Sequence, residues 1–149
     1  MKDQTRRPSP AWIVTAIACA AIAVAACAGS SNAPKKDEPA TVEPVAGNED
    51  LFTITLTERA AQRLDVQTIA VRDSGDGVVV PYSAVFYGHD GETWVYVNPS
   101  PLTYVRAVVE VADIVGGQEA VLSNGPEPGT NVVTVGVAEL YGTEFEVGH

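Results

Sequence analysis

Short alternating apolar segments, separated by turn residues roughly every ten positions, dominate the chain from Leu51 onward. The clearest lies at residues 104–111, where every second residue is apolar, as in a half-buried strand. The expected strands are 52–56, 66–71, 78–81, 84–87, 93–97, 104–111, 120–122 and 132–135. Such a series of short strands predicts a mainly β fold, a small antiparallel β-sandwich or barrel.

One short helix is expected directly after the first strand. Thr57 suits its N-cap, Glu58 favours its first turn, and Arg63 suits its last turn. The tight turns between strands are marked by glycine-rich segments, of which 88–91 with its Asp-Gly pair is a strong hairpin signal. The expected buried face of the helix consists of Ala60, Ala61 and Leu64.

The N-terminus has a basic start at Arg6 and Arg7 and an uncharged apolar run over residues 11–26. This run is shorter than the roughly 20 residues of a membrane span, and it ends in small residues, as signal peptides do. The end of the run, Val24-Ala25-Ala26-Cys27, resembles the lipobox of bacterial lipoproteins. The resemblance implies cleavage between Ala26 and Cys27 and attachment of diacylglycerol to the Cys27 thiol; the alternative is an uncleaved anchor with an incidental cysteine.

Three regions are therefore expected: a signal peptide at 1–26, a lipidated cysteine with a disordered linker at 27–50, and a β domain at 51–149. The linker is predicted because its polar, proline-containing composition offers little to bury. The expected location is the extracytoplasmic side of the cell membrane, where acylated Cys27 would bind membrane lipid.

The expected mature chain is strongly acidic, with six Lys and Arg residues against 18 Asp and Glu residues from Cys27 onward. Such a surface repels phosphate backbones, which argues against a nucleic-acid partner. Both cysteines, Cys19 and Cys27, precede the expected domain, so no disulfide is expected to stabilise it.

Two stretches of the domain resemble the membrane-proximal domain of periplasmic adaptor proteins, the membrane fusion proteins of efflux pumps. The first is Val80-Pro81-x-Ser83-Ala84-Val85 with the following hairpin and Trp94-Val95-Tyr96-Val97; the second runs from Val121 to Gly142. Residues 54–71 are similar to the start of heavy-metal-type adaptors, with Asp65 where those proteins usually have glycine. Asp tolerates the left-handed conformation next best, so the turn is expected to survive.

In those adaptors the two chain ends meet in one domain, and the remaining domains are inserted between them. The resemblance therefore implies that the strand at 52–56 or 66–71 pairs with the C-terminal strands. It also implies docking against an integral membrane transporter, without the lipoyl, hairpin and barrel domains. The family contributes no catalytic residues.

We find no pattern of residues typical of catalysis. The only histidines are His89, in a hairpin tip, and the terminal His149, and no methionine follows Met1. Glu144 and Glu146 are expected along an extended, solvated tail. The sequence therefore predicts a protein that is not an enzyme and has no metal or cofactor.

Trp94, Tyr96 and Tyr104 are expected to share one face of adjacent strands. This face either packs in the core or forms a partner-binding patch, because exposed aromatic residues concentrate binding energy. The leading hypothesis is an accessory docking lipoprotein of an envelope export system. The alternatives are a lipoprotein that binds a small ligand or hard cation through acidic loops, and a purely structural envelope protein.

Overall fold

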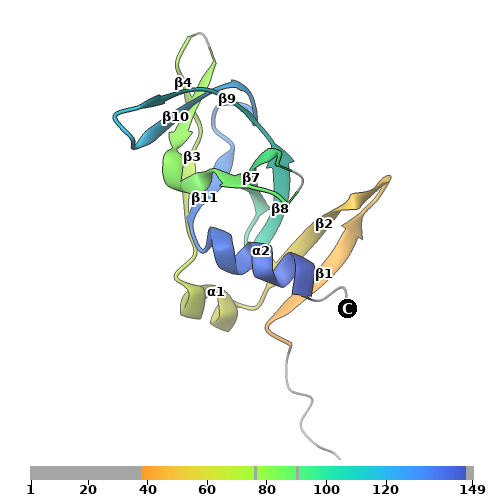
Figure 1. Ribbon diagram of the computed structural model, residues 1–149. Coiled ribbons are helices and arrows are strands. Elements are labelled where there is room, and N and C mark those ends of the chain that lie inside the picture. The colour runs from red at the N-terminus through yellow and green to blue at the C-terminus, as the bar shows by residue number, and fades with distance from the viewer. Residues whose placement is uncertain (1–37, 76, 90, 147–149) are drawn as a thin grey trace, which may run out of the picture. The chain divides into compact units, whose positions relative to one another are not determined.

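A computed structural model describes residues 38–75, 77–89 and 91–146 (Figure 1). Every strand pairing in it is antiparallel. The large sheet contains, in order, β1 (Ala40–Val45), β2 (Asn48–Leu56), β8 (Thr103–Val108), β7 (Thr93–Ser100), β11 (Asn131–Val135) and β3 (Gln67–Ala70), with β6 (Phe86–Tyr87) also paired to β7. The small sheet contains β4 (Arg72–Asp73), β5 (Val78–Pro81), β10 (Glu119–Asn124) and β9 (Glu110–Val115). The predicted fold class is confirmed: the described part is mainly β, sandwich-like, and not a closed barrel.

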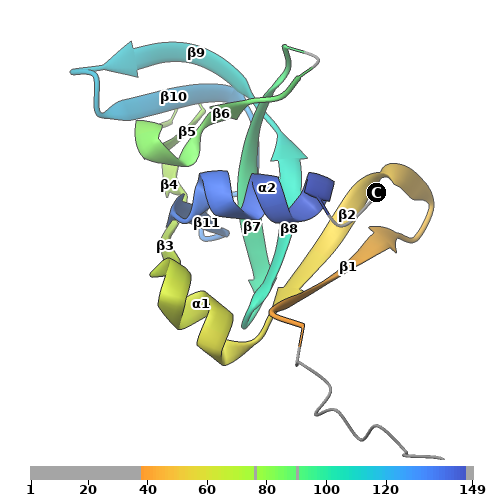
Figure 2. The ribbon, with the colours of Figure 1, turned by 60° about the horizontal axis from the view of Figure 1, so that its bottom comes forward.

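Each face of the large sheet covers its own core. Successive residues of a strand point to opposite faces, so Val95 of β7 enters one core and Tyr96 enters the other. The first core lies between the two sheets and contains Val80, Leu122 and Val132. The second lies between the large sheet and two helices, α1 (Glu58–Leu64) and α2 (Val137–Glu146), the latter crossing the sheet in Figure 2.

The predicted start of α1 is confirmed in detail. The backbone N–H of Ala60 donates to Thr57 Oγ1 at 3.2 Å, which satisfies one of the donors that a helix start leaves free. Asp65 ends the helix in the left-handed conformation, with φ of 50° and ψ of 43°. Asp65 therefore supports the turn for which the adaptor family uses glycine.

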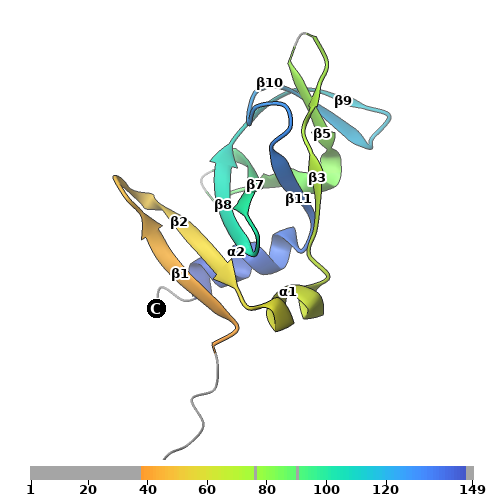
Figure 3. The ribbon, with the colours of Figure 1, turned by 180° about the vertical axis from the view of Figure 1, so that it is seen from behind.

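The predicted pairing of an early strand with the C-terminal strands is also confirmed. β3 is hydrogen-bonded to β11, with Ala70 opposite Asn131 and Thr68 opposite Val133 (Figure 3). β2 instead pairs with β1 on one side and β8 on the other.

The expectation of a disordered linker over residues 27–50 is wrong for residues 40–50. β1 pairs with β2 from Ala40 opposite Leu56 onward, and Ala40 and Val42 pack against the second core. Pro44 argued for a linker, but β1 is an edge strand, where a missing N–H is tolerated.

The expectation of an extended, solvated tail is wrong as well, and the described chain has two α-helices where one was predicted. Glu144 lies in α2 and is only 3% exposed, and Glu146 is the last residue of this helix. Val137, Leu140 and Tyr141 pack against the second core, at the spacing of one helix face. This helical spacing was missed because the segment is short and follows an uninterrupted series of strand signals.

Candidate functional site

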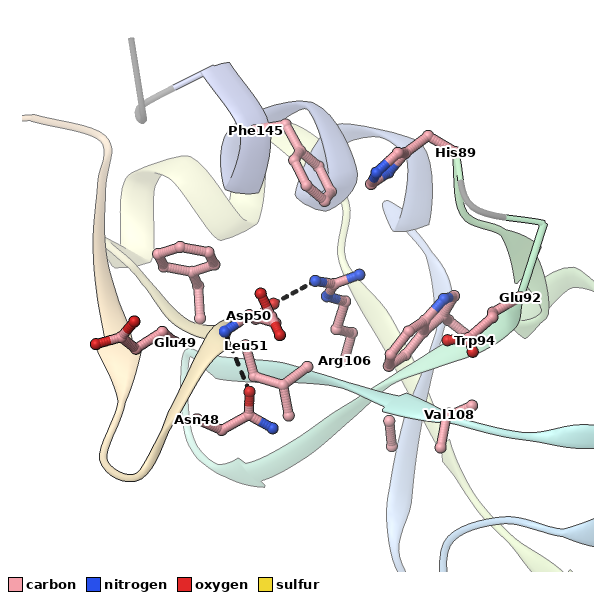
Figure 4. Close-up of a pocket in the computed structure, with 12 residues that line it drawn as sticks. Asn48, Glu49, Asp50, Leu51, His89, Glu92, Trp94, Arg106, Val108 and Phe145 are labelled. Atoms are coloured by element: carbon pink, nitrogen blue, oxygen red, sulfur yellow. Dashed lines mark hydrogen bonds between the residues drawn. The ribbon is translucent and has the colours of Figure 1, made fainter.

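One pocket of about 650 Å³ lies where the β1–β2 hairpin, β7, β8 and the end of α2 come together (Figure 4). Trp94 and Arg106 form its floor from adjacent strands, and Phe145 of α2 closes one side. The lining consists of Asn48, Glu49, Asp50, Leu51, Phe52, His89, Glu92, Trp94, Arg106, Ala107, Val108 and Phe145.

Arg106 is a buried cation at the centre of this region and is 6% exposed. It stands directly opposite Tyr96 in the β7–β8 pairing, so it faces the helices rather than the small sheet. Its Nε lies 2.8 Å from Glu144 Oε1, and its NH2 group donates to the backbone carbonyl of Asp50. The guanidinium is therefore held by charge from α2 and by the backbone of β2.

Two aromatic rings flank the Arg106 guanidinium. Its central carbon lies 4.4 Å from the ring centroid of Trp94 and 5.3 Å from that of Phe145. Such cation–π contacts are strongest where the cation is desolvated, as it is here. The arginine thus joins the sheet to the C-terminal helix.

Glu144 also accepts a hydrogen bond from the Tyr96 hydroxyl, at 2.5 Å to Oε2. Burial raises the pKa of the Glu144 carboxyl above its ordinary value, and the contacts with Tyr96 and Arg106 offset part of this shift. Burial, together with the Glu144 contact, raises the pKa of Tyr96, so this phenol remains protonated and donates. The result is a buried polar network that fixes α2 on the sheet.

The predicted aromatic patch proves to be part of the interior. Trp94, Tyr96 and Tyr104 do share one face, but their exposed fractions are 8%, 0% and 4%. Tyr96 and Tyr104 belong to the core beneath α1 and α2. Of the two alternatives for this face, packing in the core is therefore the one that the structure supports, and a partner-binding patch at these residues is not.

The sequence prediction also missed Arg106 and Glu144. A signal for Arg106 was present, because a charged residue alternated with Tyr104 on a face expected to be buried. Its partner could not be identified, since Glu144 was assigned to a solvated tail.

Three acidic residues, Glu49, Asp50 and Glu92, contribute to the pocket lining. His89 also lines the pocket, with its ring edge-on to Phe145 at 5.8 Å between centroids. Among the described residues, no three His, Cys, Asp or Glu side chains form a group that could hold a metal ion.

Comparisons with protein-family models, with characterised proteins and with solved structures give no match for this chain. Within the described residues, no helix is long and apolar enough to span a membrane. The predicted processing site at Ala26 and Cys27 lies outside the described residues.

Proposed function

We propose that this chain is a non-enzymatic lipoprotein, anchored by Cys27 on the extracytoplasmic side of the cell membrane, whose β domain docks on an integral membrane transporter. The partner class comes from the resemblance to the membrane-proximal domain of efflux adaptors. We prefer binding over catalysis because the buried charged groups of the site, Arg106 and Glu144, are engaged in holding α2 to the sheet.

The observation that carries this proposal is the pairing of β3 with β11. The adaptor resemblance required an early strand and a C-terminal strand to meet in one sheet, and this is a long-range contact that no local pattern predicts. The motif at residues 80–85 also forms a compact unit, in which β5 leads directly into a 3₁₀ turn at Tyr82–Ala84.

The tether limits how far the domain reaches from the lipid. Thirteen residue steps separate Cys27 from Ala40, the first residue of β1. Whatever their conformation, they span at most about 45 Å. Confinement of two proteins to one membrane raises their effective concentration, so even a small interface would suffice.

The exposed apolar residues of the β9–β10 hairpin are the contact surface that we propose for the transporter. Ile114 and Val115 are 40% and 51% exposed and adjoin the turn at Gly116 and Gly117. They are successive residues near the tip of an edge strand, so their side chains point to opposite faces of the hairpin, and a partner that encloses the hairpin tip would contact both.

Photo-cross-linking in native membranes tests this docking. A photoreactive residue at position 115 should give a cross-link to an integral membrane protein, whereas the same residue at the exposed position Glu127 should give much less. A photoreactive residue at position 112 serves to test the surface itself, since position 115 is then free to be substituted. From position 112 the chain with Ile114 and Val115 should give the cross-link, and the Ile114→Ser/Val115→Ser chain should lose it. Equal products from positions 115 and 127, or none from either, would contradict the proposal.

A further inference from the structure

Two arginines of the described chain have no charged partner. Of its four arginines, the one in β4 pairs with a glutamate of β10, and the one in β8 pairs with a glutamate of α2. The other two, Arg59 and Arg63 of α1, are exposed, and their side chains form no ion pair or hydrogen bond with another described residue. Their spacing of four residues places them on one side of the helix. That side of α1 therefore carries two unpaired positive charges.

The acidic residues of the same segment lie on another side of α1. Glu58 and Asp65 line a small pocket together with Leu102 and Tyr104, and neither arginine belongs to that lining. Asp65 is also engaged by Gln67, whose side-chain amide donates to its carboxylate at 2.9 Å. The charges of α1 are thus segregated, with the arginines apart from the carboxylates.

The tether that leads to Cys27 joins the domain at this helix. The carbonyl of Pro39 accepts hydrogen bonds from the backbone N–H of Thr57 at 3.0 Å and from its hydroxyl at 3.3 Å. Thr57 is the N-cap of α1, so the end of the tether is bonded to the start of the helix. Figure 1 and Figure 3 show α1 and the start of β1 at one end of the domain and the β9–β10 hairpin at the other. The unpaired arginines therefore lie at the end from which the tether leaves.

The rest of the chain is acidic, so an anionic surface would attract it only at this end. From Cys27 onward, 18 Asp and Glu residues outnumber six Lys and Arg residues. The tether itself is balanced, because Lys35 and Lys36 are followed directly by Asp37 and Glu38. Anionic lipids attract basic residues that lie within a Debye length of the surface and repel carboxylates. Electrostatics thus favours one orientation, with the arginine side of α1 toward the lipid.

We propose that the side of α1 that carries Arg59 and Arg63 contacts the anionic phospholipid head groups of the membrane that holds the anchor. Guanidinium groups suit this contact because they can donate two parallel hydrogen bonds to a phosphate. This inference rests on the lipid anchoring proposed above and adds an orientation to it. In this orientation the β9–β10 hairpin is directed away from the lipid, toward the part of the transporter that projects from the membrane.

Head-group quenching measures which end of the lipidated protein faces the bilayer. Cleavage before Cys27 removes Cys19, and acylation blocks Cys27, so one introduced cysteine is the only free thiol. A fluorophore is attached to Gln62→Cys on α1 or, as the matched position at the opposite end, to Gln118→Cys beside the β9–β10 turn; both glutamines are exposed. Each protein is placed in vesicles that contain a quencher lipid spin-labelled on its head group. The vesicles consist of phosphatidylcholine alone or of an equal mixture with phosphatidylglycerol.

The label at position 62 should be quenched more strongly when phosphatidylglycerol is present, and this increase should disappear at high salt. The label at position 118 should show no such increase. An increase at both positions alike, at neither, or one that persists at high salt would overturn the proposal. Flotation of the vesicles is measured in parallel. A chain that does not float lacks the anchor, which contradicts the proposed function and this inference together, whereas a chain that floats without the increase at position 62 contradicts this inference alone.

The arginines themselves are tested by substitution. Because each basic residue near an anionic surface favours contact about fivefold, Arg59→Gln/Arg63→Gln should remove most of the increase at position 62. Arg72→Gln, which removes an exposed arginine of the small sheet, should retain the increase. Equal quenching in the two variants would show that the α1 arginines do not make the contact. The vesicles contain no transporter, so the cross-linking at position 115 is tested separately.

Discussion

At the residue scale, the described domain depends on a buried ion pair between β8 and α2. Arg106 and Glu144 are both almost fully buried, and Tyr96 supplies a third polar group to the pair. Removing two charges from water is costly, so each charge is tolerated only while the other is present. The network therefore contributes to the unique placement of α2 more than to its net stability.

Replacing one residue of the Arg106–Glu144 pair should destabilise the domain more than replacing both residues by apolar ones. Arg106→Met leaves Glu144 buried and uncompensated, and we expect a loss of about 3–5 kcal/mol in the free energy of unfolding. Arg106→Met/Glu144→Leu should cost clearly less than the sum of the two single substitutions. Denaturant unfolding measures these differences. Arg72→Met, which breaks the exposed ion pair between Arg72 and Glu119, serves as the control and should lower the free energy of unfolding by at most about 1 kcal/mol. Additive costs in the double variant would refute the coupling.

The raised pKa of Glu144 predicts the direction of one pH effect. A carboxyl whose pKa is higher in the folded state binds more protons there than in the unfolded chain. Its contribution to stability is therefore present below the ordinary pKa of 4.5 and decreases as the pH rises through the raised folded value. As the pH rises through this range, the free energy of unfolding of the wild type should decrease relative to that of Glu144→Gln. Unfolding curves of both proteins at several pH values measure it; a shift in the opposite direction would show that the ion pair outweighs burial.

At the scale of elements, local patterns predicted most strands but not the two elements whose role depends on tertiary contacts. Residues 104–111 were predicted as one strand, but the chain divides there: β8 of the large sheet ends at Val108 and β9 of the small sheet begins at Glu110. The alternation itself holds, since Tyr104 and Val109 enter opposite cores. β1 was missed because its proline and its polar neighbours are tolerable only on a sheet edge. α2 was missed because its buried face is defined by what it covers. The same omission made the covered aromatic residues look available for binding.

The contribution of α2 can be measured through its most buried residue. Leu140 is fully buried in the second core, so Leu140→Ala should destabilise the domain by about 2–5 kcal/mol. Glu139→Ala, on the exposed face of the same helix, should change stability by about 0.5 kcal/mol or less. Thermal or denaturant unfolding of the two variants distinguishes them. Equal effects would mean that α2 does not cover the core as described.

At the scale of the whole molecule, the described β domain begins at most about 45 Å of chain from the cysteine that we expect to be lipidated. The pairing of β3 with β11 joins an early and a late stretch of the chain in one sheet. A domain of this kind, held at a membrane surface, is suited to contact with a membrane partner. The proposed membrane anchoring and docking depend on the processing expected at Cys27.

The mass of the intact protein extracted from native membranes tests that premise most directly. The account predicts a chain that begins at Cys27 and carries the added mass of diacylglycerol or a further acyl chain, and a Cys27→Ala variant that is unmodified and no longer anchored through lipid. A wild-type chain that retains residues 1–26 with an unmodified Cys27 would contradict the account.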